Sequence, residues 1–360
     1  MLKAVRSFLI FVGRPFYLAL ELVVLSFLTC ASLISGLVGK IKIPKRRIKI
    51  KIVWHKRRLP KFKFPKFTFP KLKLRPKVIT FVLFSAFLLL TFYFLIFKGL
   101  PSPYDLTSRP LQVSTKIYDR NGVLLYKIFK DQNRTLVSLP DIPLHVRLAT
   151  LAAEDAEFYS HPGFSIKGII RALVRNAETG ELSGGSTITQ QLVKNALLTP
   201  EKTIIRKIKE IILAMEVEKV FTKDQIFEMY LNEISYGGTA YGIKEGAQEY
   251  FRKEINNLTL SEAAYLAGLT KSPTKLSPFG ENPEMAIQRR NDVLNLMRIN
   301  RFITPEQEKE ARVEKIKITP GNKDIKAPHF VMYVRQILVD KYGESMVEKG
   351  GLEVTTTLDY

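Results

Sequence analysis

The segment GGSTITQQLVKN, residues 184–195, holds more neutral polar side chains than a surface helix ordinarily needs. We expect a helix over residues 187–198, because aliphatic residues recur there at helical spacing. Positions i, i+3, i+4 and i+7 of a helix share one face. That face carries Thr187, Gln190, Gln191 and Lys194. The two glycines ahead of it free the backbone at the helix start, where N–H groups attract anions.

Two interpretations of this polar face differ in what they explain. Thr187 and Gln190 have the spacing of a capping box, which would make them structural. A capping box leaves Gln191, Lys194 and Asn195 without a role. The sequence therefore favours a binding surface for a ligand with many hydroxyl or amide groups and an anionic group.

A second charged motif, RKIKE, spans residues 206–210. Arg206 and Glu210 are four residues apart with Lys207 beside them, but a basic residue ahead of an acidic one is the weaker order for a helical pair. An exposed pair is worth less than about 1 kcal/mol in any case. These residues are candidates for binding, and a solvated charged face is an equal alternative.

A third motif, AAEDAEFYSHPG, spans residues 152–163. Glu154 follows an apolar run of small residues, and a carboxyl partly desolvated at such an edge is a candidate general base, although the motif alone favours an ordinary acidic helix end. His161 precedes Pro-Gly and indicates a turn, and the other histidines show no metal-ligand spacing. Taken together, two glutamates, several cations and a polar binding surface indicate chemistry at the anomeric carbon of a phosphate-bearing sugar.

Two apolar runs precede these motifs. Residues 78–97, VITFVLFSAFLLLTFYFLIF, are uncharged and apolar on every helical face, so they predict a transmembrane helix through a hydrocarbon core of roughly 30 Å. Residues 16–38 form the other run, in which Glu21 is costly in a bilayer unless it is partnered or near an end. That run is predicted to span the membrane, with a re-entrant or interfacial hairpin as the alternative. It contains Cys30, the single cysteine, so the fold cannot rest on disulfides.

Most of the positive charge lies in residues 39–77, which hold seventeen Lys or Arg and no Asp or Glu. The rest of the chain carries only about +5 of the net +22, so a basic DNA-binding domain is not indicated and no nucleic-acid partner is expected. The positive-inside rule places this segment in the cytoplasm and the residues after Phe97 outside. If residues 16–38 also span the membrane, the N-terminus lies outside. The basic residues near the N-terminus conflict with that placement, because the positive-inside rule favours the cytoplasm for them. The alternation of cations with apolar residues fits a strip on the anionic inner leaflet or a disordered basic linker equally, with nucleic acid as a weaker third interpretation.

From Leu111 the composition is that of an ordinary globular domain. Strand-like runs flank Asn121-Gly122, which is a hairpin turn signal. Helical patterns then dominate, separated by Gly, Pro, Ser or Asn, at residues 143–158, 165–178, 187–198, 203–220, 223–233, 239–251 and 259–269. After Asn300 another helical stretch leads to GGLEVTTTLDY, which is strand-like. The sequence predicts a mainly α fold with small β elements before and after the helices.

Four segments then point to one family. EDAEFYSHPG, GGSTITQQLVKN, RKIKE and IFEMYLNEISYGGTAYGI, in this order and spacing, closely resemble the motifs of the peptidoglycan glycosyltransferase domain, glycosyltransferase family 51. That domain occurs in class A penicillin-binding proteins and in monofunctional transglycosylases. The resemblance covers about residues 110–300. YLAGLTKSPTKLSPF resembles the fifth motif, with Leu276 where the family often has Tyr.

The resemblance implies a lysozyme-like α fold behind one or two transmembrane helices. It implies polymerisation of lipid II on the extracytoplasmic side of the cytoplasmic (inner) membrane. The chain would then have five parts: an N-terminal segment 1–38, the basic cytoplasmic segment 39–77, a transmembrane helix 78–97, the glycosyltransferase domain with a short stalk 98–300, and a linker 301–360. In class A proteins such a linker leads into a transpeptidase domain, so a fragment of such a protein is expected in preference to a naturally short form. The S-x-x-K pattern from Ser272 to Lys275 is a chance match within the fifth motif.

The resemblance also implies residue roles. Glu154 matches the general base that deprotonates the GlcNAc 4-hydroxyl of the acceptor lipid II. That oxygen attacks C1 of the growing chain's MurNAc with inversion, and undecaprenyl pyrophosphate leaves. Glu210 matches a second essential glutamate on the donor side. The pyrophosphate would be bound by Lys194, Arg206 and Lys207, and sugar and phosphate by Ser186, Thr187, Gln190, Gln191 and Asn195. Asp155 would support Glu154, while Tyr230 and Asn232 are expected to be structural.

The partners implied are lipid II, the growing glycan chain, the membrane and other proteins of cell wall synthesis. No cofactor is firmly implied, no metal-binding residues are predicted, and a divalent cation at the pyrophosphate is left open. Two rival functions fit the sequence less well. The cations and the GGSTITQQL stretch argue against a lytic enzyme of the same shape. The intact glutamates argue against a non-catalytic membrane scaffold.

Overall fold

The computed structural model describes residues 76–165, 167–168, 185–201, 203–280, 282–319 and 325–360. It divides the chain into two compact units, Met1–Lys98 and Gly99–Tyr360. The predictions for residues 16–38 and for nearly all of the basic segment 39–77 lie outside the described residues. So does most of the helix predicted over 165–178.

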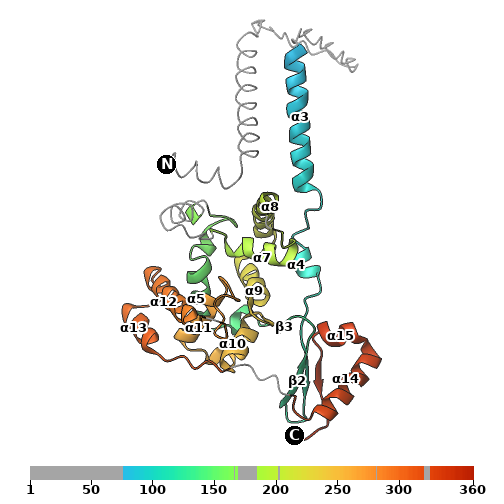
Figure 1. The fold of residues 1–360 in the computed structure, drawn as a ribbon, viewed down its shortest axis with the longest axis vertical. Coiled ribbons are helices and arrows are strands. Elements are labelled where there is room, and N and C mark those ends of the chain that lie inside the picture. The colour runs from blue at the N-terminus through green and yellow to red at the C-terminus, as the bar shows by residue number, and fades with distance from the viewer. Residues whose placement is uncertain (1–75, 166, 169–184, 202, 281, 320–324) are drawn as a thin grey trace, which may run out of the picture. The chain divides into compact units, whose positions relative to one another are not determined.

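The first unit contains the long helix α3, Pro76–Phe97. Its stretch Thr80–Phe97 has a mean hydropathy of 2.4, and almost all of its side chains are exposed. Within the described part of the chain, this is the one helix long and apolar enough to cross a membrane, by length and composition. The helix predicted over 78–97 is confirmed (Figure 1), and its insertion in a membrane stays a prediction.

Helices build most of the second unit, which confirms the mainly α prediction. The larger of its two cores is built from α5 (Leu144–Glu154), α7 (Ile188–Leu197), α8 (Ile204–Val220), α9 (Lys223–Glu233), α10 (Ile243–Phe251), α11 (Leu260–Leu269), α12 (Glu284–Ile299) and α13 (Pro305–Val313). Every residue of α11 from Ser261 to Leu269 is buried, and the helix packs against both α5 and α12 (Figure 1). Its alanines present single methyl groups, which lets these neighbouring helices approach closely.

Helices α7, α9, α11 and α13 begin with the same local structure. A threonine accepts a hydrogen bond from the N–H of the third helical residue, and the Gln or Glu side chain at that position accepts one from the threonine N–H. The threonines are Thr187, Thr222, Thr259 and Thr304. Each such cap is worth about 1 kcal/mol. The T-x-x-Q/E pattern therefore determines where these helices start.

A smaller core brings together the beginning and the end of the second unit. Strands β1 (Thr115–Tyr118) and β2 (Leu124–Ile128) form the predicted hairpin, and Gly122 in its turn has a positive φ of 82°. Strand β6 (Glu353–Thr355) pairs in parallel with β1. Helices α14 (Pro328–Tyr342) and α15 (Glu344–Lys349) pack against this sheet (Figure 1). The hairpin thus shares a core with residues beyond 325, whereas the sequence-based division grouped it with residues 98–300.

Short elements complete the second unit: α4 (Asp105–Ser108), β3 (Asn133–Arg134), β4 (Ser235–Gly237), β5 (Ala240–Tyr241) and the 3-10 helices η1 (Leu139–Asp141), η2 (Phe158–Ser160) and η3 (Ile255–Asn257). The helix predicted over 239–251 begins only at Ile243, because β5 and Gly242, with a φ of 81°, precede it.

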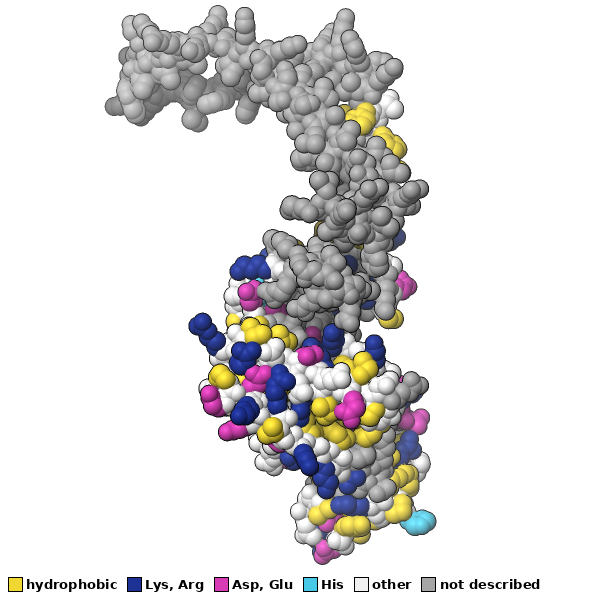
Figure 2. Space-filling model, turned by 60° about the vertical axis from the view of Figure 1, so that its left-hand side comes forward, with side chains coloured by type: hydrophobic (Ala, Val, Ile, Leu, Met, Phe, Trp, Pro, Cys, Tyr) yellow, Lys and Arg dark blue, Asp and Glu magenta, His cyan; other side chains and the backbone are white. Residues whose placement is uncertain are grey.

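On the face drawn in Figure 2, Lys and Arg side chains are interspersed with Asp and Glu side chains, so neither sign of charge forms a separate patch there.

Candidate functional site

Glu154 is the last residue of α5, and the chain turns immediately after it. The helix predicted over 143–158 ends here because Asp155 leaves the helical conformation, with φ −162° and ψ 78°. The Asp155 carboxylate accepts a hydrogen bond from the backbone N–H of Ile188 at 3.1 Å, at the start of α7. The change of direction therefore places Glu154 beside α7.

Two side chains donate to the Glu154 carboxylate, and a third orients one of them. Gln191 Nε2 of α7 donates to Oε2 at 2.6 Å, and the Thr270 hydroxyl at the end of α11 donates to Oε1. Tyr230 of α9 donates to Gln191 Oε1 at 3.3 Å, which orients the amide with its NH₂ toward the carboxylate. Both oxygens of Glu154 thus have a defined partner.

Thr270 is a site residue that the sequence analysis missed. It lies in the fifth-motif segment directly before Lys271, and nothing in the local pattern distinguishes it from the other hydroxyls there. Its contact with Glu154 joins residues 116 positions apart. Such a pairing depends on how α11 packs against α5, so it could be found only from the fold.

Asp155 and His161 form a second contact beside the carboxylate. His161 Nε2 lies 2.9 Å from Asp155 Oδ2, and both side chains are largely buried. The turn expected at His161 is present, and its ring also holds Asp155 in place. Asp155 supports the geometry around Glu154 through Ile188 and His161, not by touching the Glu154 side chain in the contacts described.

Glu210 of α8 is the buried carboxylate of the cluster, with 2% of its side chain exposed. Lys207 Nζ lies 2.8 Å from its Oε2 and also donates to Ser186 Oγ at 2.6 Å. Arg206 Nε lies 3.4 Å from Oε1 in an ion pair whose geometry falls short of a hydrogen bond, so both atoms keep hydrogen-bonding capacity. A buried charge must be paired to be tolerated, and two cations pair this one.

Lys194 of α7 connects the two carboxylates electrostatically. Burial lowers the pKa of its ammonium group, and the charges of Arg206 and Lys207 lower it further, while Glu210 and Glu154 oppose the shift. Lys194 therefore lies within electrostatic reach of both glutamates. The three motifs meet at α7, because Gln191 bonds to Glu154 and Lys207 joins Glu210 to Ser186 just before the helix. The roles of Glu154, Lys194 and Glu210 stay predictions.

The remaining predicted ligand contacts divide into two groups. Thr187 and Gln190 are buried and form the capping box of α7, and Thr187 also donates to the Gly163 carbonyl at 2.6 Å. Asn195 is exposed at the far end of the same helix. The structural interpretation of Thr187 and Gln190 is thus confirmed, and contact of Thr187, Gln190 or Asn195 with a ligand stays a prediction.

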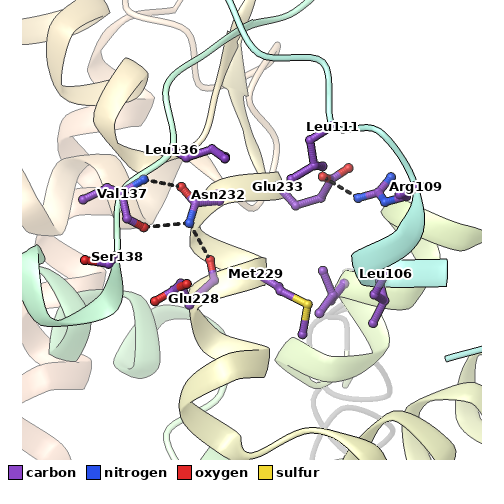
Figure 3. A pocket seen from close by; sticks show the side chains of 11 residues that line it. Leu106, Arg109, Leu111, Leu136, Val137, Ser138, Glu228, Met229, Asn232 and Glu233 are labelled. Carbon is purple, nitrogen blue, oxygen red and sulfur yellow. Dashed lines mark hydrogen bonds and ion pairs between the residues drawn. The ribbon is translucent and has the colours of Figure 1, made fainter. Parts of the chain in front are cut away.

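Asn232 makes structural hydrogen bonds to the backbone, in agreement with the role expected of it. Its amide accepts from Val137 N–H at 3.0 Å and donates to Val137 O at 2.8 Å, fixing the chain before η1 against α9. Figure 3 shows Asn232 at the edge of a cavity of about 330 Å³, which Arg109 and Glu233 also line. None of Glu154, Lys194 and Glu210 lines this cavity, so it is distinct from the cluster.

The described residues contain no group of three or more His, Cys, Asp or Glu that could hold a metal ion. Glu210, the acidic residue predicted nearest to a pyrophosphate, is already paired with two cations.

Comparison with known proteins agrees with these motifs. Residues 121–298 match the model of a protein family described as transglycosylase. Penicillin-binding protein 1A of Aquifex aeolicus (strain VF5) is 44% identical over 272 residues, which are 75% of this chain and 37% of that protein. Penicillin-binding protein 1A of Escherichia coli (strain K12) is 40% identical over 260 residues, 71% of this chain and 30% of that protein. A crystal structure of penicillin-binding protein 1A from Haemophilus influenzae aligns with 26% identity and a TM-score of 0.39, over 70% of this chain and 27% of that one.

The chain spans about a third of the length of the curated relatives it matches. The matched segment contains all of the residues in the cluster around Glu154 and Glu210. Residues 121–298 of the chain therefore form a domain of the transglycosylase family, and the relatives that share it here are penicillin-binding proteins 1A.

Proposed function

We propose that this domain polymerises lipid II into β-1,4-linked glycan strands and releases undecaprenyl pyrophosphate. The observation that carries the proposal is the cluster itself, in which Gln191 of α7 bonds to Glu154 while Lys207 joins Glu210 to Ser186 just before the same helix. A site for glycosyl transfer needs a carboxylate to accept a proton and cations to stabilise the leaving phosphate. The cluster supplies both.

In the proposed reaction, Glu154 accepts the proton of the GlcNAc 4-hydroxyl of the acceptor. That oxygen then forms a bond to C1 of the donor MurNAc, and the bond from C1 to the pyrophosphate oxygen breaks. Attack from the opposite face inverts the configuration at C1. Gln191 and Thr270 hold the carboxylate in one orientation, which limits the positions from which a hydroxyl can approach it.

The leaving group would be received on the other side of Lys194. Lys194, Arg206 and Lys207 carry three positive charges and Glu210 one negative charge, which leaves a local excess of about +2 for a pyrophosphate. Glu210 holds Lys207 and Arg206 in place, and Lys207 bonds to Ser186 as well. We infer that Glu210 organises the cations that bind the pyrophosphate.

A lipid-linked substrate also explains an apolar helix ahead of the domain. The lipid of the substrate stays in the bilayer, so the enzyme that uses it has to act at the membrane surface. Helix α3 has the length and hydropathy for an anchor. The basic residues before it favour a domain on the extracytoplasmic side of the cytoplasmic membrane. Other proteins of cell wall synthesis are proposed as partners there.

The proposal is tested by incubating the detergent-solubilised chain with labelled lipid II, beside Glu154→Gln and Glu210→Gln. We expect a ladder of glycan products from the wild type and none from Glu154→Gln. Release of muropeptides from preformed glycan would instead support a lytic enzyme. Equal polymer from the wild type and Glu154→Gln would refute the role of Glu154, and no polymer from the wild type would favour the scaffold.

A further inference from the structure

The Thr270 hydroxyl has two acceptors and one proton. It lies within hydrogen-bond distance of Glu154 Oε1 and, at 2.8 Å, of the Ala267 carbonyl in the last turn of α11. A hydroxyl can donate one hydrogen bond at a time, and it can also accept. Thr270 is 8% exposed, so little water is available to stand in for either partner. The hydroxyl therefore has two orientations available, one toward each acceptor.

The other oxygen of Glu154 faces a group that can only donate. Gln191 Nε2 points at Oε2, and reversing the amide would set its oxygen against the carboxylate. The amide is held in this orientation by Tyr230, which donates to Gln191 Oε1. Burial raises the pKa of the Tyr230 hydroxyl well above its usual value, and the charge of Glu154 raises it further, so Tyr230 remains a donor.

This asymmetry distinguishes the two oxygens when Glu154 becomes a neutral acid. A neutral carboxyl has one carbonyl oxygen, which accepts, and one O–H, which donates. The fixed donor Gln191 suits a carbonyl oxygen at Oε2. The hydroxyl of Thr270 suits an O–H at Oε1, because it can accept from that group while donating to the Ala267 carbonyl.

We propose that Thr270 is a positioning residue that directs the proton taken up by Glu154 to Oε1, by turning its hydroxyl from Glu154 to the Ala267 carbonyl. The inference rests on the proposed role of Glu154 as the base. In the step, the O–H bond of the acceptor sugar breaks and an O–H bond forms at Oε1. The Thr270 proton stays on its own oxygen throughout and changes only its acceptor. When Glu154 releases its proton to water, the hydroxyl turns back.

Other charged or titratable groups face Glu154 and will contribute to any pH profile. Lys194 comes from α7, Tyr230 from α9 and Tyr236 from β4. Burial raises the pKa of the Tyr236 hydroxyl, as does the Glu154 charge. Asp155, paired with His161, adjoins Glu154 in the chain. These groups are the same in all variants at position 270, so differences between variants report on Thr270.

The test compares pH profiles of kcat/KM for lipid II polymerisation by the full chain carrying Thr270→Val or Thr270→Ser. Valine has nearly the shape of threonine without the hydroxyl, and serine keeps the hydroxyl. Thr270 bonds to Glu154 in both states, but the bond to the charged carboxylate is the stronger by up to about tenfold in an equilibrium, so Thr270→Val should move the acidic limb to higher pH by up to about one unit. Thr270→Ser should follow the wild type. Thr274→Val, an exposed hydroxyl in the same segment, is the matched control and should not change the profile.

Thermal unfolding of each variant separates a folding defect from the expected effect, and Thr270→Ala replaces Thr270→Val if valine prevents folding. A Thr270→Val or Thr270→Ala profile that superimposes on that of the wild type overturns the inference. So does a loss of rate that is equal at every pH and shared by Thr270→Ser, because that pattern indicates packing alone. A wild type that forms no polymer at any pH refutes the proposed function instead, and the inference falls with it.

Discussion

Replacing Lys127 by methionine should destabilise the second unit by about 3 kcal/mol. Lys127 of β2 donates to both carboxylate oxygens of Glu245, at 2.8 and 2.9 Å, and so joins the small sheet to α10. The Glu245 side chain is 2% exposed and that of Lys127 is 19% exposed. Removing one partner of a buried ion pair leaves a charge without compensation and costs roughly 3–5 kcal/mol. The hydrogen bond that Thr135 donates to Glu245 remains, which favours the lower end of that range.

The assay is thermal and urea-induced unfolding of the detergent-solubilised chain, as a double-mutant cycle with Glu245→Gln. A loss of about 3 kcal/mol should lower Tm by roughly 6–12 °C for a unit of this size. In the Glu245→Gln background the buried charge is already gone, so Lys127→Met should cost less than about 1 kcal/mol. Lys116→Met is the matched control, because its partner Glu353 is 70% exposed and stays hydrated. The reasoning is refuted if Lys127→Met costs no more than Lys116→Met, or costs the same in both backgrounds.

Two further predictions concern the site, and a third concerns the stability of the fold. Glu154→Gln should lower the rate of polymerisation by about 100-fold or more with little change in Tm, since it removes the proton acceptor and keeps the shape; product ladders and unfolding curves check both. Because burial lowers the pKa of Lys194, its charge is complete at low pH and is lost, as pH rises, earlier than for an ordinary lysine. The kcat/KM profile should therefore fall on its alkaline side, and Lys194→Arg should extend it to higher pH. Gly163→Ala should destabilise the fold by about 2 kcal/mol, because Gly163 has a φ of 86° and a Cβ there would lie 2.8 Å from the Ala214 carbonyl; a Tm equal to that of the wild type would contradict this.

Local sequence signals predicted the elements that depend on local chemistry. The T-x-x-Q pattern at Thr187 marks the start of α7, and the Asn121-Gly122 turn marks the hairpin. The end of α5 was missed because it depends on Asp155 bonding to Ile188, a residue 33 positions away. A helix pattern cannot anticipate that competing hydrogen bond.

The sequence pattern also did not predict which strand pairs with the hairpin. Strand β1 pairs Ile117 with Val354 of β6, and nothing near either residue specifies the other. For the site, the local patterns left Glu154 and Glu210 open, and the resemblance to the family singled them out together with Lys194. Thr270 did not stand out, since a threonine at a helix end is ordinary until its neighbour is known.

The many polar residues on and around α7 have two kinds of role: some hold the two ends of the helix, and others belong to the site. Its start is held by the Thr187 capping box and by the Asp155 carboxylate on the Ile188 N–H. Its end is held by Arg109, which donates to the Ala196 carbonyl at 3.0 Å and so satisfies a group that the helix itself leaves unpaired. Between these anchors, Gln191 bonds to Glu154, and the charges of Glu210 and Glu154 act on the half-buried Lys194. A helix that has to hold an amide and a cation in fixed positions needs both ends secured, which is why the polar side chains of one short segment serve the fold as well as the site.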